Sequence, residues 1–440
     1  MNEGTPAPER TRVSQTTKPA RGGRRPVARH GALKSPHPVS MLLKALGVVV
    51  AVCLVSAGGV AAYALTDLTT SYVDEAVELE DQAPAPPDIG AIETGVDLLI
   101  VGTDECEEQY AYLFGARCTG ADAGGQLNDV NMLLHISNNP RRVTVVSFPR
   151  DLMLSIPSCT REDGSTTSSM SKQQINSAWS YGGLSCVAKT ISQLSGQNIP
   201  FAAKVSFGNV INITDALGGV DVCIGNGGIR DRHTGIDWPA GMRNVQGVEA
   251  LQFLRTRHGL ENGSDLARIS NQQQYMSRLA HKLVAEDVLS DFGTLYKLAS
   301  TAVDNVTPSQ SLTNPLTLVQ IALAVKDVPF DQIVFVQYPV NADPDDPNRV
   351  VPNRAAADAL WAALAANQPI QVTNDPNRGG GVVTVDPPAD AAPAPEQSPS
   401  TTPGATGEPV PPGETAVELP NSIPGVSAAQ ETCSAGNLRG

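Results

Sequence analysis

The chain has 440 residues, which is enough for one large domain or two ordinary domains together with tails. It carries 45 Asp and Glu against 31 Lys and Arg, a formal net charge of −14, and its aromatic content is 4%. Because 39 glycines and 34 prolines accompany so few aromatic residues, the composition excludes a chain that is folded throughout.

The N-terminal tail, residues 1–44, is basic and is predicted to be disordered. It precedes the uncharged apolar run "ALGVVVAVCLVSAGGVAAYAL" at residues 45–65, and about 21 residues in a helix span the ~30 Å hydrocarbon core of a bilayer. The positive-inside rule then predicts a single-pass cell-membrane protein with a cytoplasmic tail and with residues 66–440 outside the cell. A cleaved signal peptide is the alternative, but its apolar stretch is normally shorter. The tail lacks a helix-turn-helix pattern, so nucleic acid is not an expected partner.

After an extracellular stem, residues 66–95, strand and helix patterns alternate. Apolar runs predict strands at residues 96–101, 130–137, 142–157, 216–224 and 331–340. Amphipathic patterns predict helices at residues 175–181, 187–195, 264–287 and 353–367. This order predicts an α/β domain over residues 96–371, a three-layer α-β-α arrangement around a central, mostly mixed sheet. Residues 372–425 are Pro- and Ala-rich and predicted to be disordered, and residues 426–440 form a short C-terminal tail.

Six of the seven cysteines lie in the predicted external part, where oxidation to disulfides is expected. Cys106 with Cys118, and Cys159 with Cys186, would each close a short loop. Six cysteines allow many connectivities, however, and the sequence leaves the pairing open, including that of Cys433 in the C-terminal tail.

One helix changes character along its length, in "LRTRHGLENGSDLARISNQQQ" at residues 254–274. Ser264 suits the N-cap, and at about 100° per residue Asp265, Arg268 and Gln272 continue the apolar stripe that contains Met276. This pattern predicts either a solvated helix end with an Asp–Arg pair or a polar pocket in which the helix N-terminus and an arginine face an anion.

Further charged residues favour the pocket. Arg150, Arg255 and Arg257 lie at the ends of predicted elements. Guanidinium groups that converge repel one another, so an anion such as a pyrophosphate must offset the repulsion. Asp104 and Asp129 lie at the ends of two predicted strands, where carboxylates commonly bind Mg²⁺. For each aspartate taken alone, a turn or capping role is the alternative.

These residues, in this order, resemble the LytR–CpsA–Psr family of wall-polymer ligases, of actinobacterial type. The resemblance runs from about residue 97 to residue 287, with a weaker part to about residue 370. It is carried by "LLIVGTD", "NDVNMLLHIS", "VTVVSFPRDLMLSIP", "GVEALQFLRTRHG" and "GSDLARISNQQQ". The resemblance implies a membrane-anchored phosphotransferase that moves a glycopolymer from a polyprenyl-pyrophosphate lipid onto peptidoglycan through a phosphodiester link, with Mg²⁺ as cofactor.

The resemblance also assigns roles to individual residues. The metal ligands would be Asp104 and Asp129. The pyrophosphate ligands would be Arg150, Arg255, Arg257, Arg268 and Gln272. The catalytic residues would be Arg257, Asp265 and Arg268. Leu127 departs from the family pattern, because many members carry arginine there.

The lipid would need an apolar channel, which we expect to be lined by the strand around residues 130–136 and by Phe201, Phe207 and Phe253. Two other functions remain open: a polyprenyl-pyrophosphate phosphatase that uses water as the nucleophile, and a membrane-anchored envelope regulator without turnover.

Overall fold

The structure, a computed structural model, describes residues 76–84, 95–120, 125–285, 292–372, 376–385 and 416–439. All of them belong to one structural unit, residues 63–440, and the other unit, residues 1–62, lies outside them. Within the described ranges no helix has both the length and the hydropathy needed to cross a membrane. The predicted span at residues 45–65 lies outside those ranges.

A seven-stranded sheet forms the centre of this unit. In spatial order its strands are β16 (Gly425–Ser427), β10 (Ile333–Gln337), β3 (Val143–Phe148), β2 (Asn128–Ile136), β1 (Val96–Thr103), β6 (Phe201–Ser206) and β9 (Thr307–Pro308). β1 pairs antiparallel with β2 and parallel with β6, while β3 pairs antiparallel with β2 and parallel with β10. The predicted α/β class with a mixed central sheet is therefore confirmed.

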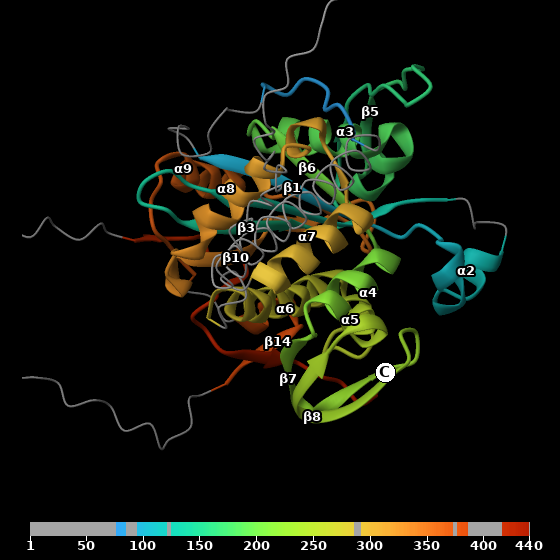
Figure 1. The fold of residues 1–440 in the computed structure, drawn as a ribbon, viewed down its shortest axis with the longest axis vertical. Helices are drawn as coiled ribbons and strands as arrows, with labels where there is room; N and C mark the ends of the chain where they lie inside the picture. Colours follow the sequence, from blue (N-terminus) through green and yellow to red (C-terminus); the bar gives the residue numbers. More distant parts are fainter. Residues whose placement is uncertain are drawn as a thin grey trace, which may run out of the picture. The chain divides into compact units, whose positions relative to one another are not determined.

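Helices cover both faces of this sheet (Figure 1). The helices are α2 (Ala116–Thr119), α3 (Ala178–Ser195), α4 (Phe207–Ala216), α5 (Gly247–Arg255), α6 (Asp265–Ala285), α7 (Phe292–Asn305), α8 (Pro315–Lys326) and α9 (Arg354–Ala365). Short 3-10 helices occur at η2 (Glu108–Leu113), η3 (Ile175–Ser177), η4 (Gln310–Leu312), η5 (Phe330–Gln332) and η6 (Pro376–Gly379). Along β1 the side chains alternate between the two faces. Leu99 packs in the cluster that contains α3 and α9, and Ile100 packs on the other face with residues of α6 and α8.

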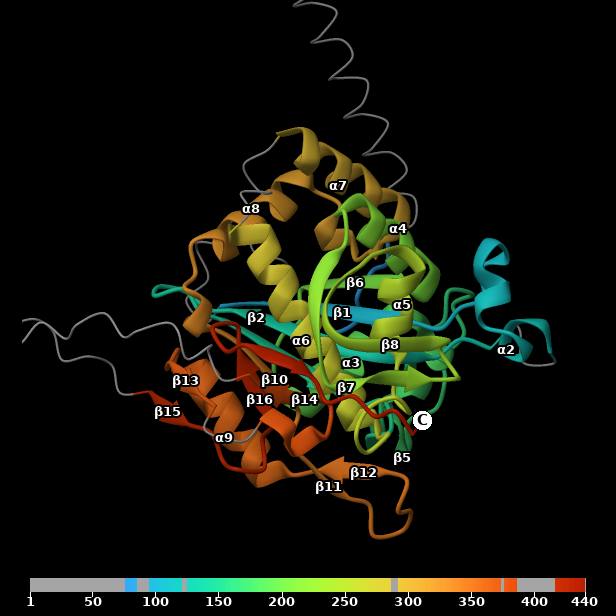
Figure 2. The same cartoon turned by 90° about the horizontal axis from the view of Figure 1, so that it is seen from below.

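Further strands lie outside the central sheet. A four-stranded sheet contains β14 (Val382–Thr384), β17 (Thr432–Ser434), β7 (Val220–Asp231) and β8 (Ile236–Val245). The two-stranded pairs are β4 (Met153–Ile156) with β5 (Met170–Gln174), β11 (Val340–Ala342) with β12 (Val350–Pro352), and β13 (Ile370–Gln371) with β15 (Val417–Glu418). The C-terminal residues 416–439 thus supply one strand to each of three sheets, and Figure 2 shows β16 beside β10.

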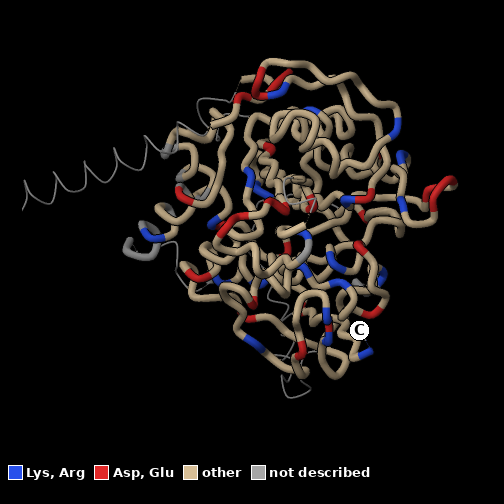
Figure 3. The backbone as a smooth tube through the Cα atoms, turned by 90° about the vertical axis from the view of Figure 1, so that its right-hand side faces the viewer, with Lys and Arg blue, Asp and Glu red and all other residues tan. Residues whose placement is uncertain are grey.

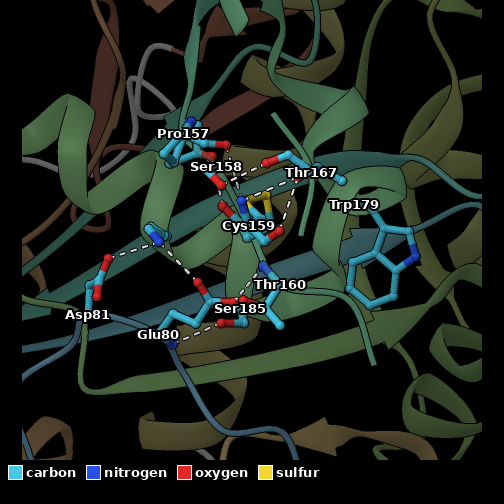
Figure 4. Close-up of a disulfide and its surroundings, with 12 residues drawn as sticks. Glu80, Asp81, Pro157, Ser158, Cys159, Thr160, Thr167, Trp179 and Ser185 are labelled. Carbon is cyan, nitrogen blue, oxygen red and sulfur yellow. Dashed lines mark hydrogen bonds and ion pairs between the residues drawn. A yellow bond between two sulfur atoms is a disulfide. The ribbon is translucent and has the colours of Figure 1, made fainter. Parts of the chain in front are cut away.

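The predicted helix at residues 175–181 begins as the 3-10 helix η3 and continues into α3, which also contains the predicted helix at residues 187–195. α3 is kinked at Gly182 and Gly183. A Cβ atom at Gly182 would lie 2.9 Å from the Cβ atom of Cys159 and 3.0 Å from that of Cys186, so only glycine fits there. These two cysteines form a disulfide (Figure 4). Of the pairings left open by the sequence, the structure contains Cys106–Cys118, Cys159–Cys186 and Cys223–Cys433.

The Cys223–Cys433 disulfide joins β7 to β17 across 210 residues of sequence. Because β17 has only three residues, we expect the double substitution Cys223→Ser/Cys433→Ser to lower the free energy of unfolding by about 2–5 kcal/mol. Urea unfolding of the variant and of the wild type, each with and without reductant, measures this. If the two oxidised proteins unfold at the same urea concentration, the disulfide does not hold the C-terminal strand in the sheet.

Candidate functional site

The site begins at the adjacent ends of β1 and β2. Gly102 pairs with Val130, but the next residue of β1, Thr103, pairs with Asn128, so Asp129 is the extra residue of a β-bulge. Bulges commonly re-aim side chains beside functional sites. Asp129 Oδ2 accepts a hydrogen bond of 2.9 Å from Arg150, and its Oδ1 is buried without a hydrogen-bond donor among the described residues.

Asp104 follows β1 directly. Its carboxylate accepts hydrogen bonds from Leu127, just before β2, and from Arg117 in α2. Its Oδ1 accepts a hydrogen bond from the backbone N–H of Leu127 at 2.8 Å. Its Oδ2 accepts a hydrogen bond of 3.1 Å from the guanidinium of Arg117. The sequence analysis missed this arginine. Arg117 is adjacent in sequence to Cys118, so the Cys106–Cys118 disulfide holds it beside the strand ends. Burial, together with the negative charge of Asp129, raises the pKa of Asp104 above its usual value.

All four predicted arginines line one cavity of about 180 Å³, which we call the arginine cavity. Its lining consists of Asp129, Arg150, Phe207, Asp231, His233, Thr234, Arg255, Arg257, His258 and Arg268. Four arginines face two aspartates, so the lining favours an anion. Along the described part of the chain trace, positions of both signs are interspersed (Figure 3). The positive lining is therefore a local feature and not part of one basic face.

Arg268 is the most enclosed of these arginines, with 5% of its surface exposed. It donates a hydrogen bond to the carbonyl oxygen of Asp129 at 2.9 Å and lies 2.7 Å from Asp265 Oδ1. Arg150 Nε lies 3.5 Å from the same Asp265 oxygen. Ser264 caps α6, accepting a hydrogen bond from the N–H of Ala267, as predicted. The first turn of α6 thus brings Asp265 between two arginines, although Asp265 itself does not line the arginine cavity.

Asp231, at the end of β7, holds the loop that carries Arg257. Its Oδ2 accepts hydrogen bonds from Thr256 Oγ1 at 2.8 Å and from the N–H groups of Arg257 at 3.0 Å and Gly259 at 3.3 Å. Burial alone would raise the pKa of Asp231, but these hydrogen bonds and one from the N–H of His233 outweigh it and lower the pKa. The sequence analysis missed Asp231 and His233, which follow the glycine-rich segment at residues 225–228.

Arg255 connects the arginine cavity to a second, apolar cavity. Its guanidinium carbon lies 4.7 Å from the ring centre of Phe114 and 5.6 Å from that of Phe207. Burial, together with the positive charge of Arg268, lowers the pKa of Arg255 even though Asp129 opposes this. Arg255 and Phe207 line both cavities, so the two are adjacent.

The second cavity, which we call the apolar channel, also has a volume of about 180 Å³. Its wall is formed by β1, β2, β6, α4, α5 and α6 and includes Ile100, Val130, Met132, Phe207, Leu251 and Met276. The prediction for Phe207 is thus confirmed. The predictions for Phe201 and Phe253 are wrong, because both side chains are fully buried in other core clusters, where they fill space between elements.

Polar side chains of α6 fix the helix against its neighbours. Gln272 lines the apolar channel instead of the arginine cavity, and its side-chain amide donates to the carbonyl oxygen of Leu254 at 2.8 Å. Gln274 donates to the carbonyl oxygens of Cys223 and Thr432. Asn271 donates to that of Phe253. The run of glutamines that follows the site therefore ties α6 to α5, β7 and β17.

His258 lies in the arginine cavity beside Arg257, with Nε2 3.4 Å from Arg257 Nη2. Burial and then the charge of Arg257 lower the pKa of His258, so the neutral imidazole is favoured. Its ring centre is 4.4 Å from that of His233.

The two predicted metal ligands can be tested against these surroundings. Asp129 keeps a buried oxygen without a donor among the described residues, and Asp104 carries a raised pKa that a nearby cation would lower. No group of three or more His, Cys, Asp or Glu within the described ranges could hold a metal ion. Mg²⁺ is commonly held by one or two carboxylates, with waters and substrate phosphates as further ligands, and the residues present fit that mode.

A mixed α/β domain in which a cluster of arginines opens onto an apolar channel defines a class of protein suited to an amphiphile with an anionic head. The chain belongs to the LytR_cpsA_psr family, whose model matches residues 63–366.

Three relatives illustrate the range of the family. The chain is 26% identical over 279 residues to the "Cell wall biosynthesis protein LcpA" of Corynebacterium glutamicum, covering 58% of this chain and 52% of LcpA. It is 26% identical over 316 residues to the "Probable cell wall biosynthesis protein LcpB" of the same organism, covering 71% of each. It is 25% identical over 265 residues to the "Polyisoprenyl-teichoic acid--peptidoglycan teichoic acid transferase TagU" of Bacillus mycoides, covering 58% of this chain and 77% of TagU. The match thus spans about half the length of LcpA.

The contrast between Arg268 and Arg257 predicts different effects on stability. Arg268→Met would leave the buried Asp265 carboxylate without its closest cation, and we expect it to lower the free energy of unfolding by about 3–5 kcal/mol. Arg257 is half-buried and its guanidinium contacts His258, so Arg257→Met should cost less than about 1 kcal/mol. Urea unfolding of both variants measures the difference. Adding Asp265→Asn to Arg268→Met should restore part of the loss, and equal costs for the two single variants would contradict the assignment.

Proposed function

We propose that this protein is a phosphotransferase that moves a glycopolymer from a polyprenyl-pyrophosphate carrier onto peptidoglycan through a phosphodiester link. One observation carries the proposal: the arginine cavity and the apolar channel share Arg255 and Phe207. A lipid with a doubly phosphorylated head needs both environments side by side, because its chain avoids water while its phosphates need cationic partners.

Two further facts support the proposal. The names of LcpA and LcpB refer to cell wall biosynthesis, and that of TagU to the transfer of teichoic acid to peptidoglycan. The apolar run at residues 45–65, read as a membrane anchor, would hold the catalytic domain outside the cell near the bilayer that contains the lipid.

In the proposed reaction a hydroxyl of the acceptor attacks the phosphorus that bears the glycan. A new bond forms from the hydroxyl oxygen to that phosphorus, the bond from phosphorus to the bridging oxygen breaks, and polyprenyl phosphate leaves. Catalysis of such a transfer consists mainly of positioning and charge stabilisation. Arg150, Arg255, Arg257 and Arg268 are the residues that would stabilise the charge on the phosphate oxygens.

The proton of the attacking hydroxyl needs an acceptor. Asp265 is the proposed acceptor, because its carboxylate lies beside Arg150 and Arg268, two of the arginines that line the arginine cavity. In the same position it also orients both guanidinium groups. His258, favoured in its neutral form, is the other group at the cavity that can accept a proton.

Asp104 and Asp129 would hold Mg²⁺. When bound, the ion would supply positive charge to the phosphate oxygens. Arg117 and Arg150 balance the same two carboxylates from the protein side.

Arg257→Ala tests the reaction directly. Since loss of one group that stabilises transition-state charge costs about 10²–10³ in rate, we expect transfer to fall at least about 100-fold. The full chain in detergent micelles would be incubated with Mg²⁺, a polyprenyl-pyrophosphate glycan and peptidoglycan fragments, and joined product would be measured. Arg230→Ala is the matched control, because Arg230 is an exposed arginine that pairs with Asp237 on β8.

The products separate the three functions. Joined glycan and peptidoglycan support the transferase. Free phosphorylated glycan without joined product would instead indicate the phosphatase, and binding of the lipid without either product would indicate the regulator.

Mg²⁺ binding is tested by thermal unfolding. A cation that binds Asp104 and Asp129 stabilises the folded protein, so we expect Mg²⁺ at saturating concentration to raise the Tm by a few degrees (about 2–4 °C). The cation competes with the proton on Asp104, whose pKa is raised, so the increase should be present above that raised pKa and disappear as pH falls through it. Asp104→Asn and Asp129→Asn should abolish the increase.

Asp163→Asn serves as the control for this experiment, because Asp163 is an exposed aspartate that accepts hydrogen bonds from Ser165 in its own loop, away from the site. An equal Mg²⁺ effect on the Tm of all four proteins would rule out the two-aspartate site.

A further inference from the structure

A third cavity, of about 400 Å³, borders the arginine cavity. It is lined by residues 149–151, 263–266 and 347–350 together with Arg257, and we call it the hairpin cavity because residues 347–350 belong to the β11–β12 hairpin. It shares Arg150 and Arg257 with the arginine cavity and no residue with the apolar channel. The three cavities thus follow one another in the order channel, arginines, hairpin cavity.

The wall that the hairpin supplies is held in place by ion pairs and hydrogen bonds. Arg349 Nη1 lies 2.9 Å from Asp151 Oδ1, and Asp151 Oδ2 lies 3.8 Å from Arg150 Nε. Lys172 Nζ lies 2.9 Å from Asp343, whose side chain is 1% exposed. The N–H of Val350 donates to the carbonyl oxygen of Asp151 at 3.3 Å. The carboxylate of Asp151 therefore links Arg349 to Arg150, which lines the arginine cavity.

Asp265 belongs to the hairpin cavity and not to the arginine cavity. Its side chain is 9% exposed. Its Oδ1 is buried without a hydrogen-bond donor among the residues that the structure describes, although Arg268 Nη2 lies 2.7 Å away as an ion pair. The proposed proton acceptor therefore lines the hairpin cavity.

We propose that the hairpin cavity binds the acceptor, a sugar of the peptidoglycan glycan chain, and that Arg349 and Asp151 determine its position; this rests on the function proposed above. In an in-line transfer the attacking oxygen and the leaving oxygen lie on opposite sides of the phosphorus. The lipid in the channel fixes the leaving side, so the acceptor enters from the hairpin cavity. The attacking hydroxyl loses its proton to Asp265 as its oxygen bonds to phosphorus, and the lipid phosphate departs toward the channel.

The chemistry of the lining fits a sugar. Pro149, Leu266 and Pro347 offer apolar surface to the C–H groups of a sugar ring, while Arg349 and Asn348 offer hydrogen-bonding groups to its hydroxyls. The volume falls within the range of small-molecule sites. The donor also carries a sugar, next to its second phosphate, so an experiment must distinguish the donor sugar from the acceptor sugar.

Steady-state kinetics of Arg349→Ala make this distinction. The full chain in detergent micelles would be assayed with varied peptidoglycan fragment at fixed donor lipid, and then with the two reversed. Loss of a charged hydrogen-bonding group should raise the KM for the acceptor about tenfold and leave kcat and the KM for the donor within about twofold of wild type. Arg349→Lys, which keeps the charge without the guanidinium fork, should fall between Arg349→Ala and wild type.

Arg230→Ala is again the matched control and should behave as wild type. If Arg349→Ala raises the KM for the donor instead, the hairpin cavity takes the donor's own sugar and the proposal is overturned. It is equally overturned if neither KM changes while wild type and Arg230→Ala form joined product, an outcome that leaves the proposed function intact. If wild type forms no joined product, both the proposed function and this inference fail. If Arg349→Ala does not fold, the KM of Arg349→Lys for the acceptor is the test: an increase supports the proposal and an unchanged value overturns it.

Discussion

Repulsion among four guanidinium groups in one small cavity is the constraint on which the rest of the site depends. The groups cannot lose their charge, so the protein must hold them by other means. Three aspartates do this from three different elements: Asp129 from the bulge of β2, Asp231 from the end of β7 and Asp265 from the start of α6. Asp129 and Asp265 each form an ion pair with an arginine, and Asp231 accepts a hydrogen bond from the backbone N–H of Arg257. The positive potential that remains is available for an anion.

The same constraint explains why so much of α6 is polar and buried. A helix that carries Arg268 must not move when an anion binds, because a small displacement would open the Asp265 ion pair. Gln272, Gln274 and Asn271 hold the helix through hydrogen bonds to backbone carbonyl oxygens of α5, β7 and β17. Buried amides that are satisfied in this way position a helix more specifically than apolar packing alone. The C-terminal strand β17 thereby contributes to the site from more than 150 residues away in sequence.

Hydrophobic periodicity and the positions of charged residues allowed part of the fold and part of the candidate site to be predicted from the sequence. The strands at β1, β2 and β10 and the helices α6 and α9 have apolar patterns long enough to identify, and charged groups beside such patterns indicated the arginines and Asp129. Strands β15, β16 and β17 have two or three residues and no period, and their partners lie far away in sequence, so the sequence alone did not indicate them. Asp231 was missed because it follows a glycine-rich segment typical of turns. Phe201 was misassigned because hydrophobicity predicts burial but not whether a side chain faces a cavity or a filled core.

Arg255 couples the two halves of the proposed donor site. It is stacked against Phe114 and Phe207, it lines the apolar channel, and its charge is already poorly solvated. An apolar chain in the channel would exclude the remaining water from one side of this guanidinium. In that lower local dielectric the attraction between Arg255 and a phosphate becomes stronger, while the unpaired arginine becomes less stable. Binding of the chain and binding of the phosphates therefore reinforce each other. The binding free energies of a molecule with only the chain and of a molecule with only the phosphates add up to less than that of the intact lipid.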